Sequence, residues 1–380
     1  MPCPDGAPVR CLVVNAGSST LKLSVLDEGS LVATEDLEAP GGRPGPGAIS
    51  GLIDRFGPFD VAGHRVVHGG QEFVEPVLVD DEVVRKLQAL TPLAPVHQGG
   101  TLAGLAAVSE KLPHVPAVAC FDTAFHASLA PPAYTYALPE AWRKKWGLRR
   151  YGFHGLSHAY ASRRAAEMAG DRPEKPASRP LRVITCHLGS GSSLAAVEGG
   201  ACVDTTMGFT PLEGLVMGTR SGTVDPGLVL WLAQEAGLSP GEISDQLEHA
   251  SGLLGLAGTA DMREVLAAEE AGDERASLAI AVYVHRLTAL VCSMAAALGG
   301  LDVLVFTGGV GEHAAPVRAR AARRLDFLGV ALDEGANQAA QSDADITAAG
   351  APVRALVITA REDLEIARGA RQVLERTQLP

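Results

Sequence analysis

The sequence predicts an α/β fold built from two related halves, on three observations. Short β-rich runs such as RCLVVN (10–15), DVAGHRVV (60–67) and RVITCHL (182–188) alternate with longer Ala/Leu-periodic segments, the pattern of sheets covered by helices. A strand, a Gly/Ser turn and a second strand occur at NAGSSTLKLSV from residue 15 and again at HLGSGSSLAAV from residue 187. With 380 residues, the chain is long for one core and about right for two domains.

The elements follow from these runs in chain order. The apolar runs predict strands at 10–15, 21–27, 60–67, 115–122, 182–188, 193–199, 302–308 and 352–359. The periodic segments, most of which follow a polar or glycine-rich turn, predict helices at 97–111, 156–169, 225–235, 275–299, 312–325 and 362–375. GGRPGPG (41–47) predicts a surface loop, and GDRPEKPASRP (170–180) predicts either a linker or a long loop within a domain.

Charge and cysteine usage narrow the function classes. Lys and Arg number 32 against 44 Asp and Glu, and the net charge of -12 argues against nucleic acid as a partner. The six cysteines form no CxxC pair, which favours reduced thiols and a cytoplasmic location. The N-terminus lacks an apolar signal core, and the apolar stretch 277–298 contains His285 and Arg286, so it predicts a buried helix and no membrane span.

Three glycine-rich turns are candidates for binding phosphate. The first hairpin offers Asn15 and Lys22, and the second offers Gly189, Gly191 and neighbouring serines. One such sequence alone is equally typical of an ordinary tight hairpin turn. Two related hairpins in the same chain favour phosphate binding. FTGGVGEH (306–313) follows an apolar strand and opens a helix, which suits either a nucleotide or a simple helix-entry turn. No GxxxxGK[ST] run occurs in the sequence, so a P-loop is excluded.

Charged residues follow several of the predicted strands. GHRVVHGG contains Arg65, and MGTRSGTVDPG places Arg220 among glycines; both guanidinium groups suit a carboxylate or a transferring phosphoryl group. Asp122 ends an apolar strand, where it would face a ligand crevice or cap a helix. His154 in RYGFHGLSH is either catalytic or structural. Glu362 opens a predicted helix, where the helix dipole alone favours a carboxylate.

Together, and in this order, these segments resemble the acetate kinase family, a branch of the acetate and sugar kinase, heat-shock chaperone and actin superfamily. The resemblance runs from Asn15 to Arg368, and GHRVVHGG, FDTAFH, RYGFHGLSH, TPLEGLVMGTRSG and FTGGVGE are jointly specific for it. It implies duplicated ribonuclease H-like (actin-like ATPase) domains, each with a mixed sheet flanked by helices, and ATP in the interdomain cleft. The implied domains are 1–150 plus 365–380, where the C-terminal helix returns, and 151–364, and the implied assembly is a homodimer.

The resemblance also implies a role for each matching residue. Catalysis would use Arg65, Asp122, His154 and Arg220, with Arg65 also binding the acid. The methyl group of the acid would contact Val67, Val96, Phe153 and Pro211. Asn15 and Glu362 would hold Mg²⁺, with Mn²⁺ as an alternative. ATP or ADP would contact Lys22, His187, Gly189, Ser190, Gly191, Asp261, Met262, Arg263, Gly308, Gly309, Val310 and Gly311.

The implied reaction is reversible transfer of the γ-phosphoryl group of ATP to acetate, giving acetyl phosphate and ADP. Propionate or butyrate kinase is the alternative within the family, because one methylene changes binding by only about 1–3 kcal/mol. An ATP-switched binding protein of the actin or chaperone kind is a remote alternative, which paired arginines beside an apolar pocket disfavour. Four residues depart from the family pattern, namely Ser190, Thr223, His313 and Arg361.

Overall fold

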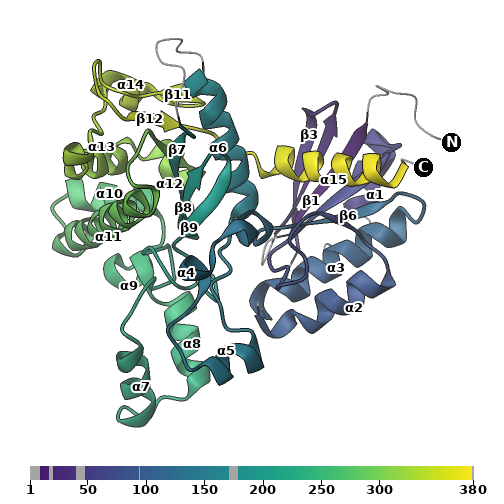
Figure 1. Cartoon of the computed structure of the whole chain (residues 1–380), viewed down its shortest axis with the longest axis horizontal. Helices are drawn as coiled ribbons and strands as arrows, with labels where there is room; N and C mark the ends of the chain where they lie inside the picture. Colours follow the sequence, from purple (N-terminus) through teal and green to yellow (C-terminus); the bar gives the residue numbers. More distant parts are fainter. Residues whose placement is uncertain (1–8, 17–19, 40–47, 94, 171–178, 379–380) are drawn as a thin grey trace. The chain divides into compact units, whose positions relative to one another are not determined.

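The computed structural model of the chain describes residues 9–16, 20–39, 48–93, 95–170 and 179–378. The chain forms two compact units, and each is described by itself (Figure 1). The first unit contains residues 1–127, 153–160 and 361–380, and the second contains residues 128–152 and 161–360. The predicted loop at 41–47 and most of the predicted connection at 170–180 lie outside the described residues.

These units differ from the predicted domains at residues 128–150, 153–160 and 361–364. Hydrogen bonds explain each difference. Arg150 Nη1 donates to the carbonyls of Thr206 and Met207, which ties the segment before it to the second unit. The Gly155 amide donates to the Asp122 carbonyl, and the Asn15 amide group donates to Glu362, so both of the other segments pack in the first unit.

The first unit is a mixed sheet with helices on both faces. Its sheet has the order β3-β2-β1-β4-β6-β5, in which β1, β4 and β6 are parallel and β1, β2 and β3 form an antiparallel meander. The strands are β1 (Arg10–Ala16), β2 (Thr20–Asp27), β3 (Ser30–Glu38), β4 (Val61–Val66), β5 (Val77–Leu78) and β6 (Ala117–Phe121). The helices are α1 (Ala48–Phe56), α2 (Asp81–Ala89), α3 (Pro95–Lys111), the start of α6 (Gly155–Gly170) and α15 (Glu362–Gln378). Short 3-10 turns cover Thr91–Leu93 and Ala124–Ser128.

Successive side chains of β1 point to opposite faces of this sheet and pack in two different core clusters. Leu12 and Val14 pack in one core cluster with α3, whereas Cys11 and Val13 pack in another with α15. A Cβ atom at Gly63 on β4 would lie 2.7 Å from an Ile366 methyl carbon, so glycine there lets α15 approach the sheet closely.

The second unit contains a second mixed sheet, with the order β11-β12-β10-β7-β8-β9. Its strands are β7 (Arg182–Leu188), β8 (Ser192–Glu198), β9 (Ala201–Thr205), β10 (Val303–Thr307), β11 (Ala344–Asp345) and β12 (Arg354–Val357). Besides the rest of α6, its helices are α4 (Pro131–Tyr134), α5 (Glu140–Trp146), α7 (Pro226–Gln234), α8 (Pro240–His249), α9 (Gly252–Ala257), α10 (Met262–Glu270), α11 (Glu274–Leu298), α12 (Gly308–His313), α13 (Ala315–Arg324) and α14 (Glu334–Ala339). A 3-10 turn covers Asp326–Leu328.

The two sheets have the same topology, which confirms the predicted duplication. The second sheet, in the order β9-β8-β7-β10-β12-β11, corresponds strand by strand to the first, in the order β3-β2-β1-β4-β6-β5. Each sheet has an antiparallel meander, then two parallel strands, then a short antiparallel edge strand. The similar hairpin sequences form the corresponding pairs β1–β2 and β7–β8. Asn15 and His187 occupy the same position, one residue before the end of β1 and β7.

Helix α11 is long and apolar enough to cross a membrane by length and composition, but half of its most apolar window is buried inside the protein. Tyr283, Leu287 and Val291 belong to the main core cluster of the second unit. A core helix therefore accounts for the composition, as the sequence predicts.

The helix predicted at 312–325 is present as α13, but its predicted start is wrong, because the chain breaks at Ala314 and residues 312 and 313 belong to α12. Pro316 occupies the first turn of α13 and has no N–H group to continue the helical hydrogen bonds of α12. The Glu312 carbonyl, which a continuous helix would pair with residue 316, instead accepts a hydrogen bond of 2.8 Å from Arg318 Nη1.

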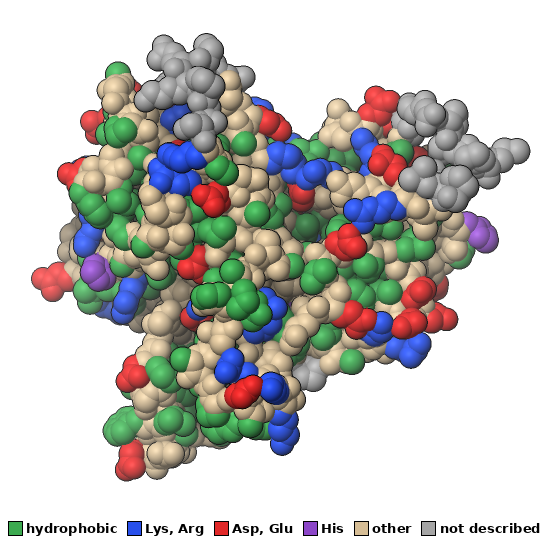
Figure 2. Space-filling model, in the orientation of Figure 1, with side chains coloured by type: hydrophobic (Ala, Val, Ile, Leu, Met, Phe, Trp, Pro, Cys, Tyr) green, Lys and Arg blue, Asp and Glu red, His purple; other side chains and the backbone are tan. Residues whose placement is uncertain are grey.

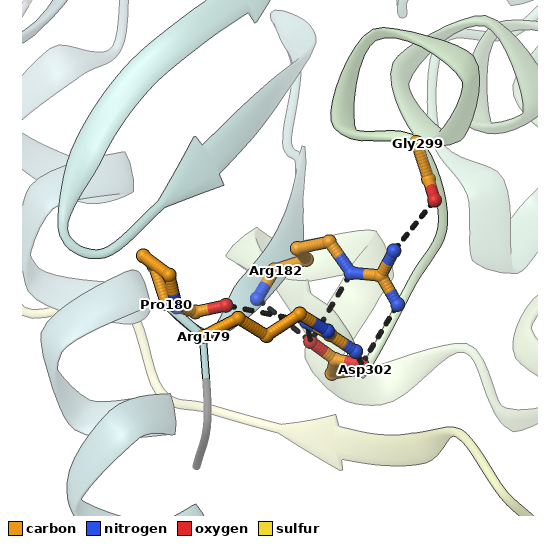
Figure 3. Close-up of polar contacts among 5 residues, drawn as sticks. All are labelled: Arg179, Pro180, Arg182, Gly299 and Asp302. Carbon is orange, nitrogen blue, oxygen red and sulfur yellow. Dashed lines mark hydrogen bonds and ion pairs between the residues drawn. The ribbon is translucent and has the colours of Figure 1, made fainter.

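A cluster of ion pairs holds the amino-terminal ends of β7 and β10 together (Figure 3). The Asp302 carboxylate accepts hydrogen bonds from the Arg179 and Arg182 guanidinium groups and from the Arg182 backbone amide. Arg182 Nη1 also donates to the Gly299 carbonyl at the end of α11. Although burial opposes ionisation, the arginine hydrogen bonds hold the pKa of Asp302 well below its ordinary value.

Candidate active site

In the first unit, polar side chains gather where three neighbouring parallel strands end. Asn15 lies near the end of β1, Arg65 near the end of β4, and Asp122 directly after β6. Strands β1 and β4 are parallel neighbours, as are β4 and β6, so their carboxyl ends meet at one edge of the sheet. Glu362, the first residue of α15, joins them although it lies 347 residues from Asn15 in sequence.

These four side chains form one hydrogen-bonded cluster. Arg65 donates from Nε (3.0 Å) and Nη2 (2.6 Å) to Asp122 Oδ2 and from Nη1 to Asn15 Oδ1 (3.2 Å). Asn15 Nδ2 donates to Glu362 Oε2 (3.0 Å), which also lies 3.9 Å from Arg65 Nε. The contacts fix the plane of the guanidinium group and therefore the direction in which Arg65 can present its remaining N–H groups.

Burial and charge act in opposite directions on this cluster. Burial raises the pKa of Asp122 to about 6, and the neighbouring Arg65 opposes that rise. Burial alone would lower the pKa of Arg65, but Asp122 and Glu362 keep it above its ordinary value, so the guanidinium stays charged. Asp122 Oδ1 is buried and has no hydrogen-bond partner among the described residues.

The same cluster supplies oxygen donors for a hard divalent cation. Among the described residues, no group of three or more His, Cys, Asp or Glu side chains is arranged to hold a metal ion. Mg²⁺ typically takes one or two protein oxygen ligands and completes its shell with water and substrate phosphates. Glu362, Asn15 and the Asp122 Oδ1 atom that lacks a hydrogen-bond partner fit that limited role.

Lys22 is exposed and lies directly opposite Asn15 in the register of β1 and β2. Both side chains therefore lie on one face of the hairpin.

His154 precedes α6 in a backbone conformation that is rare for a residue with a side chain. Its φ is 57°, in the left-handed region, and its carbonyl accepts the His158 amide. A Cβ atom on the next residue, Gly155, would lie 2.1 Å from the Asp122 carbonyl oxygen. Glycine is therefore needed for α6 to begin against Asp122, and local strain of this kind is often found at functional sites.

Three of the predicted acid-pocket residues lie in the first unit, and the structure describes the side chains of two of them. Val67 follows β4 directly and is buried, and Phe153 is buried with its ring edge-on to His68 at a centroid distance of 5.5 Å. The His126 ring nitrogen Nε2 lies 3.0 Å from the Phe153 carbonyl oxygen and anchors this backbone. The Val96 side chain lies outside the described residues, and Pro211 belongs to the second unit.

The second unit contains a largely apolar cavity of about 620 Å³. Seven residues predicted to contact nucleotide line it, namely Gly189, Ser190, Asp261, Met262, Arg263, Gly309 and Val310. Of the other predicted residues, His187, Gly191, Gly308 and Gly311 are not part of the lining, and Lys22 belongs to the first unit. The prediction missed Gly218, Leu253, Ala260, Leu266, Tyr283, Ala314 and Pro316, which also line the cavity, as does His313. Gly218 lies in the motif TPLEGLVMGTRSG, and Ala260 directly precedes the predicted Asp261, whereas Tyr283 lies within the long helix α11, where no motif marks it.

The glycine turn beside this cavity has little room for side chains. Gly308 has φ +78°, and a Cβ atom there would lie 3.0 Å from the Leu188 backbone. Its amide donates to Glu312 Oε1, which also accepts the Ala360 amide. Asp261 caps α10 and pairs with Arg263; these hydrogen bonds lower the pKa of Asp261 to about 2.

Arg220 lies in an extended loop that two segments of the second unit hold. Its Nη1 donates to the Pro211 carbonyl at 3.2 Å. On either side of it, Thr219 Oγ1 donates to the Glu248 carbonyl and the Ser221 amide donates to the Leu247 carbonyl at the end of α8. These contacts fix both the backbone and the head group of Arg220.

The structure gives local roles to three of the residues that depart from the family pattern. The Thr223 hydroxyl accepts the Gly214 amide, so it ties the Arg220 loop together. The Ser190 carbonyl accepts the Gly218 amide at 2.9 Å. In the first unit, Arg361 forms a bidentate pair with Asp363, at 2.9 Å for both Nε–Oδ1 and Nη2–Oδ2.

Comparisons with known proteins identify the family of the chain. The model of the acetokinase family matches residues 52–368. An acetate kinase from Deinococcus deserti is 45% identical over 394 residues, covering 96% of this chain and 97% of that protein. The crystal structure of acetate kinase from Porphyromonas gingivalis is similar with a TM-score of 0.87 and 36% identity, and that of a propionate kinase from Francisella tularensis with 0.87 and 34%. Both comparisons cover 96% of this chain and 100% of the other. The chain therefore belongs to the acetokinase family.

Proposed function

We propose that this protein catalyses reversible transfer of the γ-phosphoryl group of ATP to acetate, giving acetyl phosphate and ADP. The observation that carries the proposal is the Arg65–Asp122 pair, with Nη2–Oδ2 at 2.6 Å, in the same unit as the buried apolar residues Val67 and Phe153. A fixed guanidinium suits the carboxylate of a short acid, and apolar side chains suit its methyl group. The nucleotide would bind in the 620 Å³ cavity of the second unit.

The reaction needs positioning more than acid–base chemistry. The acetate carboxylate is ionised at neutral pH, so an oxygen atom can attack the γ-phosphorus without a general base while the bond to the bridging oxygen of ADP breaks. Arg65 would bind the acid, Asp122 would hold Arg65 in orientation, and Arg220 and His154 would stabilise charge on the phosphoryl oxygens.

We also propose that the reaction uses a divalent ion, Mg²⁺, and that Asn15 and Glu362 would hold it directly or through water. When bound, the ion would neutralise phosphate charge during transfer. A cytoplasmic location is proposed because ATP is the phosphoryl donor and because Cys11, Cys120, Cys186, Cys202 and Cys292 are free thiols. The homodimer expected from the family is proposed as well.

Propionate is the second candidate acid, because a propionate kinase shares the fold at 34% identity. The test is steady-state kinetics with ATP, Mg²⁺ and acetate, propionate or butyrate, with the acyl phosphate trapped by hydroxylamine. We expect the highest kcat/KM for acetate. A higher value for propionate or butyrate would reassign the acid, and absence of acyl phosphate with every acid would refute the proposal.

The proposed catalytic roles predict the effect of two substitutions. Asp122→Asn removes the charge that orients Arg65, and Arg220→Ala removes a cation from the phosphoryl group, so each should lower kcat by about 10²–10⁴-fold. The same kinetic assay measures this loss, and circular dichroism checks that both variants fold. Turnover within threefold of the parent enzyme in either folded variant would contradict its role.

A further inference from the structure

A polar network in the second unit holds the loop that contains Pro211. It consists of Tyr136, which follows α4, Arg150, which is the first residue of the RYGFHGLSH motif, and Glu213. Tyr136 donates from its hydroxyl to Glu213 Oε2 at 2.7 Å, and Arg150 Nη2 donates to Glu213 Oε1 at 2.9 Å. Each carboxylate oxygen therefore has its own donor.

The network also binds the backbone of the loop. The Tyr136 oxygen accepts the Phe209 amide at 2.9 Å, and Arg150 Nη1 donates to the carbonyls of Thr206 (3.1 Å) and Met207 (2.9 Å). Burial, followed by the Glu213 carboxylate, raises the pKa of Tyr136, so its hydroxyl stays protonated and can donate. The side chains of Tyr136 and Arg150, both held by Glu213, thus fix consecutive peptide groups from residue 206 to 209.

The space for the network depends on a glycine. A Cβ atom at Gly208 would lie 1.8 Å from Glu213 Oε2 and 2.2 Å from the Tyr136 hydroxyl oxygen. Any side chain there would displace the carboxylate or the phenol. The loop is therefore built around the Glu213–Tyr136 contact, which lies against its backbone.

The loop that contains Pro211 also contacts Arg220. Pro211 lies between the fixed peptides 206–209 and Glu213, and its carbonyl accepts Arg220 Nη1 at 3.2 Å. The Thr223–Gly214 hydrogen bonds close the other end of the segment. A change in the Glu213 side chain would therefore move the acceptor that orients the Arg220 guanidinium group, while the Arg220 backbone stays held at Leu247 and Glu248.

We propose that Glu213 is a positioning residue for phosphoryl transfer: with Tyr136 and Arg150 it holds the Pro211 carbonyl where it orients Arg220. This inference rests on the proposed function, because it concerns the same reaction. A misplacement on the order of 1 Å can cost about 10²-fold in rate, so loss of the network should cost about 10–100-fold in kcat. Among the residues that the structure describes, these hydrogen bonds of the network reach none that line the nucleotide cavity, so KM for ATP should stay within about twofold of the parent value.

The test is a double-mutant cycle between Glu213→Gln and Arg220→Ala. Glu213→Gln keeps the size of the side chain and removes its charge, and Tyr136→Phe removes only the hydroxyl. The control is Glu269→Gln, which breaks another partly buried pair of the second unit, Glu269 with Arg320 at 2.8 Å. For each variant, kcat, both KM values and the melting temperature are measured.

We expect Glu213→Gln to lower kcat about 10–100-fold in the parent enzyme and less than threefold in the Arg220→Ala background, because it acts through Arg220. Tyr136→Phe should change kcat in the same direction and carries the test if Glu213→Gln does not fold. Glu269→Gln should lower the melting temperature without changing kcat. Equal losses in both backgrounds, or unchanged kcat in the single variants of an active enzyme, would overturn the positioning role but not the proposed function. A parent enzyme that makes no acyl phosphate would refute both.

Discussion

At the residue scale, the first-unit cluster shows how one sheet edge concentrates opposing charges. Arg65 contacts Asp122 and Asn15, and Asn15 contacts Glu362, so two carboxylates share one guanidinium. The buried Asp122 would be costly as an unpaired anion, and the pair would be costly to break, because either partner alone would be an uncompensated buried charge. The arrangement leaves Arg65 charged and rigid, which is what recognition of a carboxylate requires.

Sequence alone predicts part of this cluster. Asn15, Arg65 and Asp122 end adjacent strands, so their proximity follows once a parallel sheet is inferred. The addition of Glu362 needed the family resemblance, since nothing local links residues 347 positions apart. The Tyr136–Glu213–Arg150 network was not predicted, because its contacts depend on the path of irregular loops, which neither periodicity nor a motif determines.

Buried histidines of the first unit predict how its stability depends on pH. Burial lowers the pKa of His64 from 6.5 to about 4, and His68 and His126 show the same shift. Below pH 6.5 the unfolded chain binds protons that the folded chain does not, so stability should fall as the pH drops from 6.5 to 4 and change no further from this cause below 4. For His64 the shift corresponds to a loss on the order of 3 kcal/mol.

The substitution His64→Leu isolates this effect. We expect the loss of unfolding free energy between pH 7 and pH 4.5, measured by urea denaturation, to be smaller in the variant than in the parent. His114→Leu, at an exposed histidine of the same unit, is the control for replacing a histidine by leucine. Parallel pH profiles for the parent and His64→Leu would show that His64 does not resist protonation in the folded state.

At the element scale, apolar alternation predicted the central strands well and the edges poorly. Strands β1, β7 and β10 match their predicted segments because fully buried runs rich in Val, Ile and Leu are distinctive. Strand β3, at an edge, was not predicted: its residues alternate between half-buried and exposed and include charged side chains. The break between α12 and α13 was also missed, although Pro316 marks it, because Ala314 and Ala315 precede the proline and an Ala/Arg-rich helical segment follows it.

The ion-pair cluster around Asp302 joins three elements at the end of the sheet opposite Gly189 and Gly308 (Figure 3). We expect Asp302→Asn to lower the free energy of unfolding by about 1–3 kcal/mol, because two arginines lose their charged acceptor. The pKa of Asp302 is depressed in the folded state, so its contribution is complete above the ordinary pKa and is lost as the pH falls through the folded value.

Thermal melting and kinetics together test this prediction. The melting temperature of Asp302→Asn should fall at pH 7, and its difference from the parent should shrink in acid, while kcat stays unchanged. Arg179→Ala removes the more exposed arginine of the cluster and should cost less than Asp302→Asn. A loss of kcat without a loss of stability would mean that the cluster acts on the site and does not mainly join β7 to β10.

At the scale of the whole molecule, charge and apolar surface have separate consequences. On the face shown in Figure 2, acidic and basic side chains are interspersed. The net charge of the whole chain is -12, and a net charge far from zero favours solubility. Helix α7 departs from this pattern. Leu228, Leu230 and Trp231 are 46%, 59% and 55% exposed, and the helix has no buried residue. A helix that is apolar on all sides is normally covered by a neighbour.

The proposed homodimer accounts for α7 if a second copy of the chain covers it. The double substitution Leu230→Asp and Trp231→Lys should convert a dimer into a monomer, since charges would be buried without partners in the interface. Size-exclusion chromatography with light scattering measures the mass over a range of concentrations. Leu278→Asp, at a leucine of α11 that is 58% exposed, is the matched control and should leave the dimer intact. A parent protein that stays monomeric at all concentrations would refute the dimer, and a dimeric double variant would place the interface elsewhere.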